Sequence, residues 1–350
     1  MSVGFFPRYS QLGASSRCRF YMYFQRWLEL EPQADIAIFD GFSNDYLRKL
    51  YSQTPVKKSI KLREFLRMIL RAFRLPEKLI IEYELVPFLP YKYEKLLIGK
   101  RKYILNIDDN IWEKYRNKPA LQDKYDRLCS HAAGVIVANG FLYDKVKALN
   151  PNVCLIPTVV DLDKYNSADG EKFDTFTAVW IGTPVTYKYL ESFQEMLQCV
   201  FNTPQRKLLI VASSDLQHTR PLKNVNAEYV NWSEAAECGY IKRCHVGIMP
   251  LTDDEFSRGK SAYKLLQYQA AGLPLIASPV GENKKVVLPG INGFLVENTG
   301  QWQQAFEVLE QDAILYKKYS SGAAEQAYDY SLQKYFSIYK EFIDKAFAEN

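Results

Sequence analysis

The sequence has few of the residues that build metal centres or disulfide frameworks. Its 350 residues include three histidines and six cysteines, and the cysteines are scattered without a C-x-x-C pair. We therefore expect neither a zinc site nor a disulfide-stapled fold. No apolar run approaches the roughly 18–20 residues that span a bilayer. The opening residues, MSVGFFPRYS, lack the basic and apolar segments of a secretion signal. These features indicate an unexported, globular protein without a bound metal.

Positive charge is concentrated in one segment. The whole chain has a net charge of +5, whereas residues 57–78 alone carry eight Lys or Arg and two Glu, a local net charge of +6. On a helix, one face of this segment would be apolar and would consist of Leu62, Phe65, Leu66, Ile69 and Phe73. A basic stripe would lie beside it and would consist of Arg63, Arg67, Arg71, Arg74 and Lys78. Such a helix suits an anionic membrane surface. The alternative is a surface helix that packs on its own domain, and nucleic acid is not expected because no recognition module accompanies the patch.

Short apolar runs alternate with helical patterns in two series. The first series comprises residues 3–6, 35–39, 79–83, 103–107, 134–138 and 153–157, and the second comprises 176–181, 207–212, 245–249, 273–277 and 293–296. Read as buried strands, they predict an α/β protein with two doubly wound parallel sheets. We expect two Rossmann-like domains with a cleft between them, at 1–166 and 175–330. The polar stretch 167–174 would link them, and a final helix at 331–350 would join the first domain.

Ligands bind such sheets beyond the carboxyl ends of the strands, so the loops that follow the strands are the candidate sites. The loop after the first strand contains small residues, which let backbone N–H groups approach an anion, and two arginines suited to phosphate. The residues concerned are Gly13, Ser15, Ser16, Arg17 and Arg19. They predict a phosphate-binding or acceptor-binding loop. An ordinary helix cap with solvated arginines is the alternative.

Carboxylates follow two other predicted strands of the first half. Asp108 and Asp109 come after residues 103–107, and Glu84 comes after residues 79–83. A carboxylate at such a position could orient or deprotonate a hydroxyl group, which makes all three candidates for catalysis. The alternatives are a helix N-cap for the aspartates and a surface carboxylate for Glu84.

The second half repeats the arrangement. Gly182, Thr183 and Thr186 follow its first strand and offer a tight turn, hydroxyl groups and a helix N-terminus. Lys260 and Lys264 are four residues apart, so on a helix they would share a face suited to a diphosphate. Gln267 lies about one turn further along, and the S-P-V-G-E-N stretch, with Gly281, Glu282 and Asn283, follows the next strand. Two domains with similar loops suggest two substrates.

These motifs together resemble a known family. The segments GKSAYKLLQYQAAGLPLIASPVGEN (259–283), LPGINGFLVEN (288–298), VANGFLYDKV (137–146), LIPTVVDLDKY (155–165) and WIGTPVT (180–186) occur in the order typical of GT-B glycosyltransferases of family four, the retaining group-one enzymes. The first loop, GASSRCR, and the element IDDNIW (107–112) resemble a subset of bacterial enzymes that build envelope polysaccharides such as lipopolysaccharide and capsule.

The resemblance implies a nucleotide-sugar donor, UDP- or GDP-linked, bound by the second domain as a co-substrate, with no cofactor and no metal. It also implies retention of anomeric configuration. The acceptor would be a lipid-linked glycan or polysaccharide, and the enzyme would lie peripherally on the cytoplasmic face of the membrane. The family's E-x7-E pair aligns with Gly259 and Gln267, so both carboxylates are absent; Glu255 or Glu282 could substitute for the first.

Two other functions remain open at this point. A non-catalytic relative that binds nucleotide sugar, as a scaffold of a polysaccharide assembly, would tolerate the loss of the E-x7-E pair. A GT-B sugar-nucleotide epimerase would share the fold but should need more carboxylates and histidines. Hydrolysis of the donor without an acceptor would weigh against the scaffold.

Overall fold

A computed structural model describes residues 2–52, 55–168, 170–213 and 215–348. The chain divides into two compact units. Unit 1 comprises Met1–Val159, Gly259–Ser261 and Leu332–Asn350, and unit 2 comprises Val160–Arg258 and Ala262–Ser331. The boundary falls at residues 159/160 rather than at 166, so the expected linker at 167–174 lies inside unit 2. Asp169 of that stretch lies outside the described residues.

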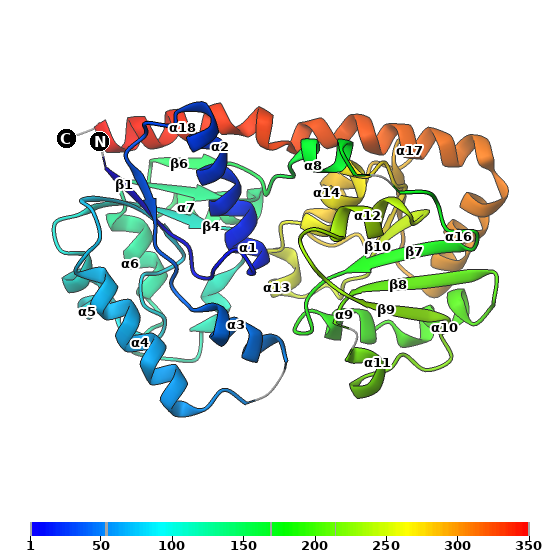
Figure 1. Cartoon of the computed structure of the whole chain (residues 1–350), viewed down its shortest axis with the longest axis horizontal. Helices are drawn as coiled ribbons and strands as arrows, with labels where there is room; N and C mark the ends of the chain where they lie inside the picture. Colours follow the sequence, from blue (N-terminus) through cyan, green and yellow to red (C-terminus); the bar gives the residue numbers. More distant parts are fainter. Residues whose placement is uncertain (1, 53–54, 169, 214, 349–350) are drawn as a thin grey trace. The chain divides into compact units, whose positions relative to one another are not determined.

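Unit 1 contains a six-stranded parallel sheet (Figure 1) in the order β2-β1-β3-β4-β5-β6. Its strands are β1 (Val3–Phe6), β2 (Ile36–Ile38), β3 (Lys78–Glu82), β4 (Lys102–Ile107), β5 (Gly134–Val137) and β6 (Val153–Leu155). Its helical segments are α1 (Ala14–Ser16), η1 (Arg17–Tyr21, a π-helical stretch), α2 (Met22–Leu30), α3 (Asn44–Tyr51), α4 (Lys58–Ala72), α5 (Tyr91–Ile98), η2 (Ile111–Lys114), α6 (Lys124–His131), α7 (Gly140–Lys147) and α18 (Leu332–Ala348).

Unit 2 repeats this architecture with the strand order β12-β11-β10-β7-β8-β9. Its strands are β7 (Phe176–Ile181), β8 (Arg206–Ala212), β9 (Ala227–Asn231), β10 (Val246–Met249), β11 (Leu275–Ala277) and β12 (Gly293–Leu295). Its helical segments are α8 (Leu162–Asn166), α9 (Tyr187–Glu191), α10 (Gln194–Phe201), α11 (Leu216–Thr219), α12 (Glu237–Lys242), α13 (Glu255–Arg258), α14 (Tyr263–Ala270), α15 (Asn283–Val286), α16 (Thr299–Gln311), α17 (Ala313–Ala327) and η3 (Tyr328–Tyr330).

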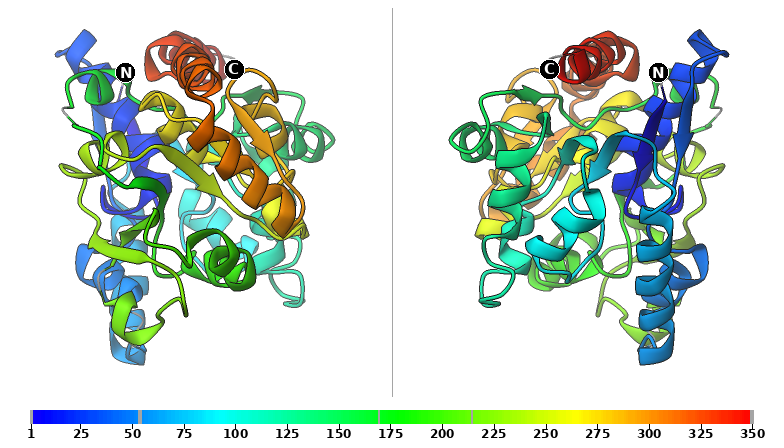
Figure 2. Two further views of the ribbon diagram at one scale, coloured as in Figure 1. Left: turned by 90° about the vertical axis from the view of Figure 1, so that its right-hand side faces the viewer. Right: turned by 90° about the vertical axis from the view of Figure 1, so that its left-hand side faces the viewer.

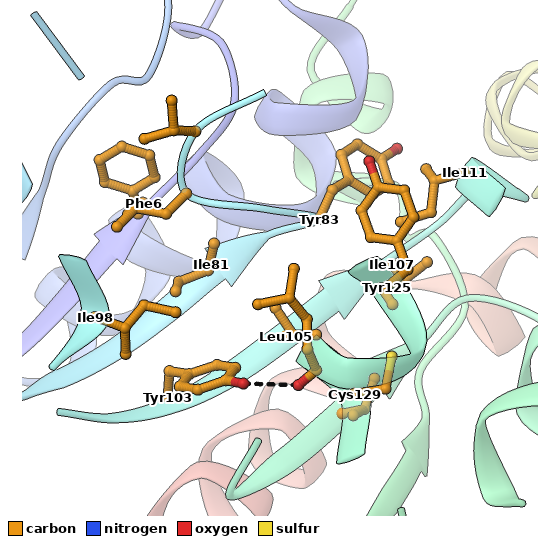
Figure 3. Packing of buried hydrophobic residues seen from close by; sticks show 14 of the residues in the cluster. Phe6, Ile81, Tyr83, Ile98, Tyr103, Leu105, Ile107, Ile111, Tyr125 and Cys129 are labelled. Carbon is orange, nitrogen blue, oxygen red and sulfur yellow. Dashed lines mark hydrogen bonds between the residues drawn. The ribbon is translucent and has the colours of Figure 1, made fainter. Parts of the chain in front are cut away.

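Neighbouring residues of a strand point to opposite faces of the sheet, and both faces of unit 1 are covered. Phe5 faces α2, where its ring meets Trp27 edge-on. Phe6 points the other way, into a core that also contains Met68 of α4. Figure 3 shows this core, in which Tyr103 of β4 donates a hydrogen bond to the carbonyl of Leu128 in α6, at 2.7 Å. Burial on both faces explains why the strands consist of nearly continuous apolar runs.

The sequence patterns predicted the strands least well at the edges of the sheets. Strand β9 was not expected, because its sequence AEYVN is polar and half exposed, as edge strands are. Strands β2 and β6 were expected to be buried, but they are edge strands whose residues are partly or fully exposed. Residues 301–319 do not form one continuous helix, because α16 ends at Gln311 and the side chain of Asp312 caps α17 by accepting from the N–H of Leu315.

Candidate active site

The first loop of unit 1 is tied to the end of β3 rather than left open. Gly13 begins the helical segment, and a Cβ there would approach Tyr9 within 2.7 Å. Ser15 and Ser16 both donate their hydroxyl hydrogens to the carboxylate of Glu82, which also accepts from the N–H of Arg8 at 2.7 Å. The two serines expected to hold phosphate therefore contact a carboxyl group, which does not favour an anion at the same point.

The two arginines of this loop are buried, so the solvated-arginine alternative is wrong. Arg19 is 1% exposed, and its guanidinium donates to Asn106 at 2.8 Å and to the carbonyls of Ile156 and Pro157 at 2.6 and 2.9 Å. Arg17 is 4% exposed and donates to the carbonyl of Gln11. Arg19 therefore links the first helical segment to β4 and to the residues after β6. These hydrogen bonds occupy its guanidinium and do not support phosphate binding by this side chain.

Asp108 lies at the end of β4, where it is 5% exposed and accepts a hydrogen bond from the hydroxyl of Tyr83. Tyr83 has a φ of +62°, and the N–H of Glu84 bonds to the carbonyl of Glu82 at 2.8 Å across it, which defines a γ-turn. The N-cap alternative for the aspartates is wrong, because the residue before η2 is Asn110 and no side chain caps that segment. Asp109 is half-buried.

Glu84 is buried among basic and phenolic side chains, so the surface alternative for this residue is also wrong. Its carboxylate accepts from Lys124 at 2.6 Å, Lys114 at 2.9 Å and the hydroxyls of Tyr115 and Tyr125 at about 2.9 Å. Burial alone would raise the pKa of Glu84, but Lys124, Lys114 and Arg8 outweigh it and lower that pKa. A carboxylate with so many donors is poorly placed to accept a proton from substrate, which favours a structural role.

Glu82 has the opposite electrostatic character. Burial, together with the nearby charge of Asp108, raises the pKa of Glu82 to about 7, against the hydrogen bonds from Ser15, Ser16 and Arg8, which lower it. The end of β3 thus carries one carboxyl group that favours its proton and, two residues later, one that is held ionised.

Glu82, Tyr83 and Arg8 belong to this site although no sequence motif predicts them. Glu82 and Tyr83 end an apolar run, so the rule that sites follow strands could have pointed to them. The positive φ of Tyr83 leaves no mark in the sequence, because Tyr rarely adopts that conformation.

In unit 2, the loop after β7 forms a compact turn. Thr186 accepts from the N–H of Thr183 at 3.0 Å and donates to its carbonyl at 3.1 Å. A Cβ at Gly182 would come within 2.3 Å of Trp180 and 2.9 Å of Thr186, so only glycine fits there. The helix that follows, α9, has five residues. Its dipole is correspondingly small, so the backbone amides and hydroxyls of the turn are the stronger candidates for contact with phosphate.

The two lysines do not share a helical face, which corrects the expectation from their spacing. Helix α14 begins at Tyr263 after Ala262, whose φ is +53°. Lys264 is therefore in the helix, with its ammonium 5.4 Å from the ring of Trp180, whereas Lys260 precedes the helix in the segment that belongs to unit 1. Within unit 2, Lys264 lies close to the end of β7.

The remaining donor candidates lie in and after α14. Gln267 is 2% exposed, and its side-chain nitrogen has no hydrogen-bond partner among the described residues. Gly281 has a φ of +52° and packs against the backbone of Arg258. Asn283 is buried and donates to the carbonyl of Ser278 at 3.0 Å, and Glu282 forms an ion pair with Lys285 at 2.8 Å. Asn283 thus shapes the loop, while the side chain of Gln267 is buried.

Helix α4 runs along the outside of unit 1 (Figure 2). The expected apolar face is split in two: Phe65 and Ile69 pack against the core, whereas the adjacent stripe stays at least half exposed. That stripe comprises Leu62, Leu66, Leu70 and Phe73. It lines a groove of about 1030 Å³ together with Arg63, Arg67, Arg71 and Arg74.

The part of the chain that the structure describes contains neither a metal-binding cluster nor a membrane-spanning helix. No group of three or more His, Cys, Asp or Glu side chains is placed to hold a metal ion in that part of the chain. No helix among the described residues is long and apolar enough to cross a membrane.

Comparisons with known proteins place this geometry in context. Residues 175–312 match the family described as Glycosyl transferases group 1, which confirms the family resemblance for unit 2. Comparison with curated proteins gave no match. Among solved structures, HepE of Anabaena in complex with UDP aligns over 99% of this chain and 100% of its own, with 14% identity and a TM-score of 0.68.

Two further structures cover nearly the whole chain. Sucrose-phosphate synthase of Thermosynechococcus elongatus aligns over 99% of both chains, with 13% identity and a TM-score of 0.72. A glycosyltransferase of Rickettsia africae covers 100% of this chain and 99% of its own, with 14% identity and a TM-score of 0.62. The expected GT-B fold, two Rossmann-like units with parallel six-stranded sheets, is confirmed.

Proposed function

We propose that this chain, whose unit 2 matches the group 1 glycosyl transferases and whose fold is GT-B, moves a sugar from a nucleoside diphosphate to an acceptor hydroxyl. The observation that carries the proposal is the Gly182–Thr186 turn at the end of β7, with the ammonium of Lys264 beside it. Its amides, hydroxyls and positive charge match the chemistry of a diphosphate. HepE, of the same fold, binds UDP and UDP-glucose, which supports a UDP-linked donor.

The donor's leaving group is a diphosphate, whose negative charge grows as the sugar departs. Lys264 and Lys260 would supply the compensating charge, so we do not expect the reaction to require a metal or a cofactor. The buried amide of Gln267 would hydrogen-bond the donor, and Glu282 or Glu255 would contact the transferred sugar in place of the missing carboxylate. Retention of configuration rests on the family resemblance alone.

On the acceptor side, Asp108 is the strongest candidate to orient or deprotonate a hydroxyl group. It ends β4, and Tyr83 fixes one of its oxygens, which leaves the other for substrate. Asp109 is the second candidate. Glu84 is better assigned to holding the β3 loop in place, because its carboxylate is occupied by four donors.

We further propose that the acceptor is a lipid-linked glycan or polysaccharide at the cytoplasmic face of a membrane. The support is helix α4, whose exposed Leu62, Leu66, Leu70 and Phe73 lie beside arginines. An interfacial helix combines these two features, because the apolar stripe enters the lipid boundary while the cations meet anionic head groups.

Thermal shifts with UDP, GDP, ADP and CMP, each with and without EDTA, test the donor assignment. A ligand at 100 times its Kd stabilises the native state by about 2.7 kcal/mol. We expect one diphosphate to raise the Tm regardless of EDTA. The shift should shrink in Lys264→Ala and in Lys260→Ala, and it should persist in Lys284→Ala, an exposed lysine of α15. No shift with any nucleotide would overturn the proposal.

A non-catalytic scaffold remains the second candidate, because the first carboxylate of the E-x7-E pair is replaced by Gly259. The two functions differ in turnover. A transferase should slowly hydrolyse its donor when no acceptor is present, whereas a scaffold should bind the same donor and leave it intact.

A further inference from the structure

The loop after β3 presents an aromatic ring to solvent from a strained backbone. Phe88 has a φ of +63°, and 55% of the residue is exposed. A bulky side chain rarely adopts a positive φ, and its cost is of order 1–3 kcal/mol. Burial cannot account for this conformation, since more than half of Phe88 lies in water. Strain of this kind occurs most often at binding and catalytic sites, where the surrounding structure enforces it.

A buried network enforces the conformation of Phe88. The N–H of Phe88 donates to the hydroxyl of Tyr115 at 2.8 Å, and that hydroxyl donates in turn to Glu84. Lys124, which is fully buried, bridges Glu84 and Glu94 at 2.6 Å each. Glu94 also accepts from the N–H of Leu85 at 2.6 Å, so both ends of the loop are fixed to one charged cluster.

The same cluster carries more positive than negative charge. Arg8, Lys114 and Lys124 surround the two carboxylates Glu84 and Glu94. The ammonium of Lys114 lies 4.8 Å from the centre of the Phe88 ring, and that of Lys118 lies 4.5 Å from it. Lys118 is exposed, and the side chain of Lys114 is 27% exposed. The exposed ring is therefore bordered by two cations that solvent can reach.

We infer that Phe88, Lys114 and Lys118 form a subsite for a sugar that carries a negative charge, such as a uronic acid or a sugar phosphate. The apolar C–H face of the sugar would lie on the ring of Phe88. Its anionic group would bind the two ammonium groups. The entropic cost of ordering these side chains would be lower because they are already held beside the ring. The inference rests on the proposed function in one respect, because only the proposed transferase reaction makes this sugar part of the acceptor.

Saturation-transfer NMR on the full chain without nucleotide tests this subsite. The probes are glucuronate, glucose 1-phosphate and the neutral methyl glucoside, with inorganic phosphate as a competitor. We expect both anionic sugars, or one of them, to bind more tightly than methyl glucoside, and phosphate to displace them only weakly. Equal binding of the neutral sugar, equally strong competition by phosphate, or no binding of any probe would overturn the inference.

The variants are chosen so that the fold is kept. Phe88→Asn removes the ring, but Asn tolerates a positive φ, so the backbone strain should fall rather than rise. We expect it to weaken binding of the anionic sugar about fivefold or more. Lys118→Gln should weaken the anionic sugars and leave methyl glucoside unchanged. Tyr93→Ala is the matched control, because Tyr93 is also exposed and has the ammonium of Lys92 4.7 Å from its ring.

The thermal shifts with nucleotides distinguish a failure of the subsite inference from a failure of the proposed transferase function. If UDP stabilises the chain but Phe88→Asn binds glucuronate and glucose 1-phosphate like wild type, the subsite is wrong and the donor assignment stands. If no nucleotide binds while the anionic sugars bind through Phe88, the subsite is supported and the proposed transferase function is wrong.

Discussion

Tyr83 donates its phenolic hydrogen to Asp108 from a backbone position with a φ of +62°. The turn at Tyr83 sends three consecutive side chains to three different partners. Glu82 meets the serines of the first loop, Tyr83 meets Asp108, and Glu84 enters the buried cluster of lysines and tyrosines. The strained turn thus organises the carboxyl end of the unit 1 sheet.

Tyr83→Phe should destabilise unit 1, because Asp108 is 5% exposed and loses its phenolic donor. A buried acceptor left without its partner costs about 1–3 kcal/mol. Urea denaturation monitored by fluorescence measures this change, with Tyr93→Phe as the control on an exposed tyrosine. If both variants unfold at the same urea concentration, the hydroxyl of Tyr83 contributes nothing to the stability of the site.

The raised pKa of Glu82 predicts a pH-dependent stability. An acid whose pKa is higher in the folded state stabilises the fold while protonated, so its contribution is complete below about pH 4.5 and is lost as pH rises to about 7. The loss is on the order of 3 kcal/mol at 1.36 kcal/mol per pKa unit. Glu82→Gln should remove this decline, so that its Tm exceeds that of wild type at pH 8 but not at pH 4.5. Parallel Tm profiles for the two proteins would contradict the assignment.

Lys124→Met should be strongly destabilising, because it leaves Glu84 and Glu94 buried without the ammonium that bridges them. Removing one member of a buried charge cluster typically costs 3–5 kcal/mol. Chemical denaturation gives the free energy of unfolding. The exposed Lys100→Met serves as the control and should change it by less than about 0.5 kcal/mol. A loss of less than about 1 kcal/mol in Lys124→Met would show that the cluster reorganises easily.

The membrane proposal predicts binding to vesicles that contain anionic lipid. The double variant Leu66→Gln with Leu70→Gln should bind more weakly at any salt concentration, while Arg63→Gln with Arg74→Gln should bind with reduced salt sensitivity, since each surface cation is worth about 1 kcal/mol. Arg67 and Arg71 are left intact, because they donate to the carbonyls of Gly41 and Asp40.

Co-sedimentation with the vesicles measures these differences. Ile314→Gln is the control, since Ile314 is an exposed apolar residue of α17 in unit 2, and it should bind like wild type. Equal binding by the α4 variants and by wild type would remove helix α4 from the membrane proposal.

The sequence by itself determined the two-sheet architecture. Strands buried on both faces must be apolar along their whole length, so runs such as FTAVWI and YILNI predicted both the elements and their parallel pairing. The same reasoning placed Asp108 and the Gly182–Thr186 turn at the ends of strands. It failed for β9, because an edge strand keeps polar residues and loses the pattern.

Only the tertiary structure decided which of these residues are exposed and what they contact. Arg19 proved to be buried between β4 and the end of β6, and Glu84 met Lys124, which lies 40 residues further along the chain. Lys260 and Lys264 were separated by the start of a helix that their spacing did not reveal. Periodicity depends on neighbours within a few residues, whereas the partner of a charged side chain depends on how distant elements pack. The fold could therefore be derived from local patterns, but the roles of the charged residues could not.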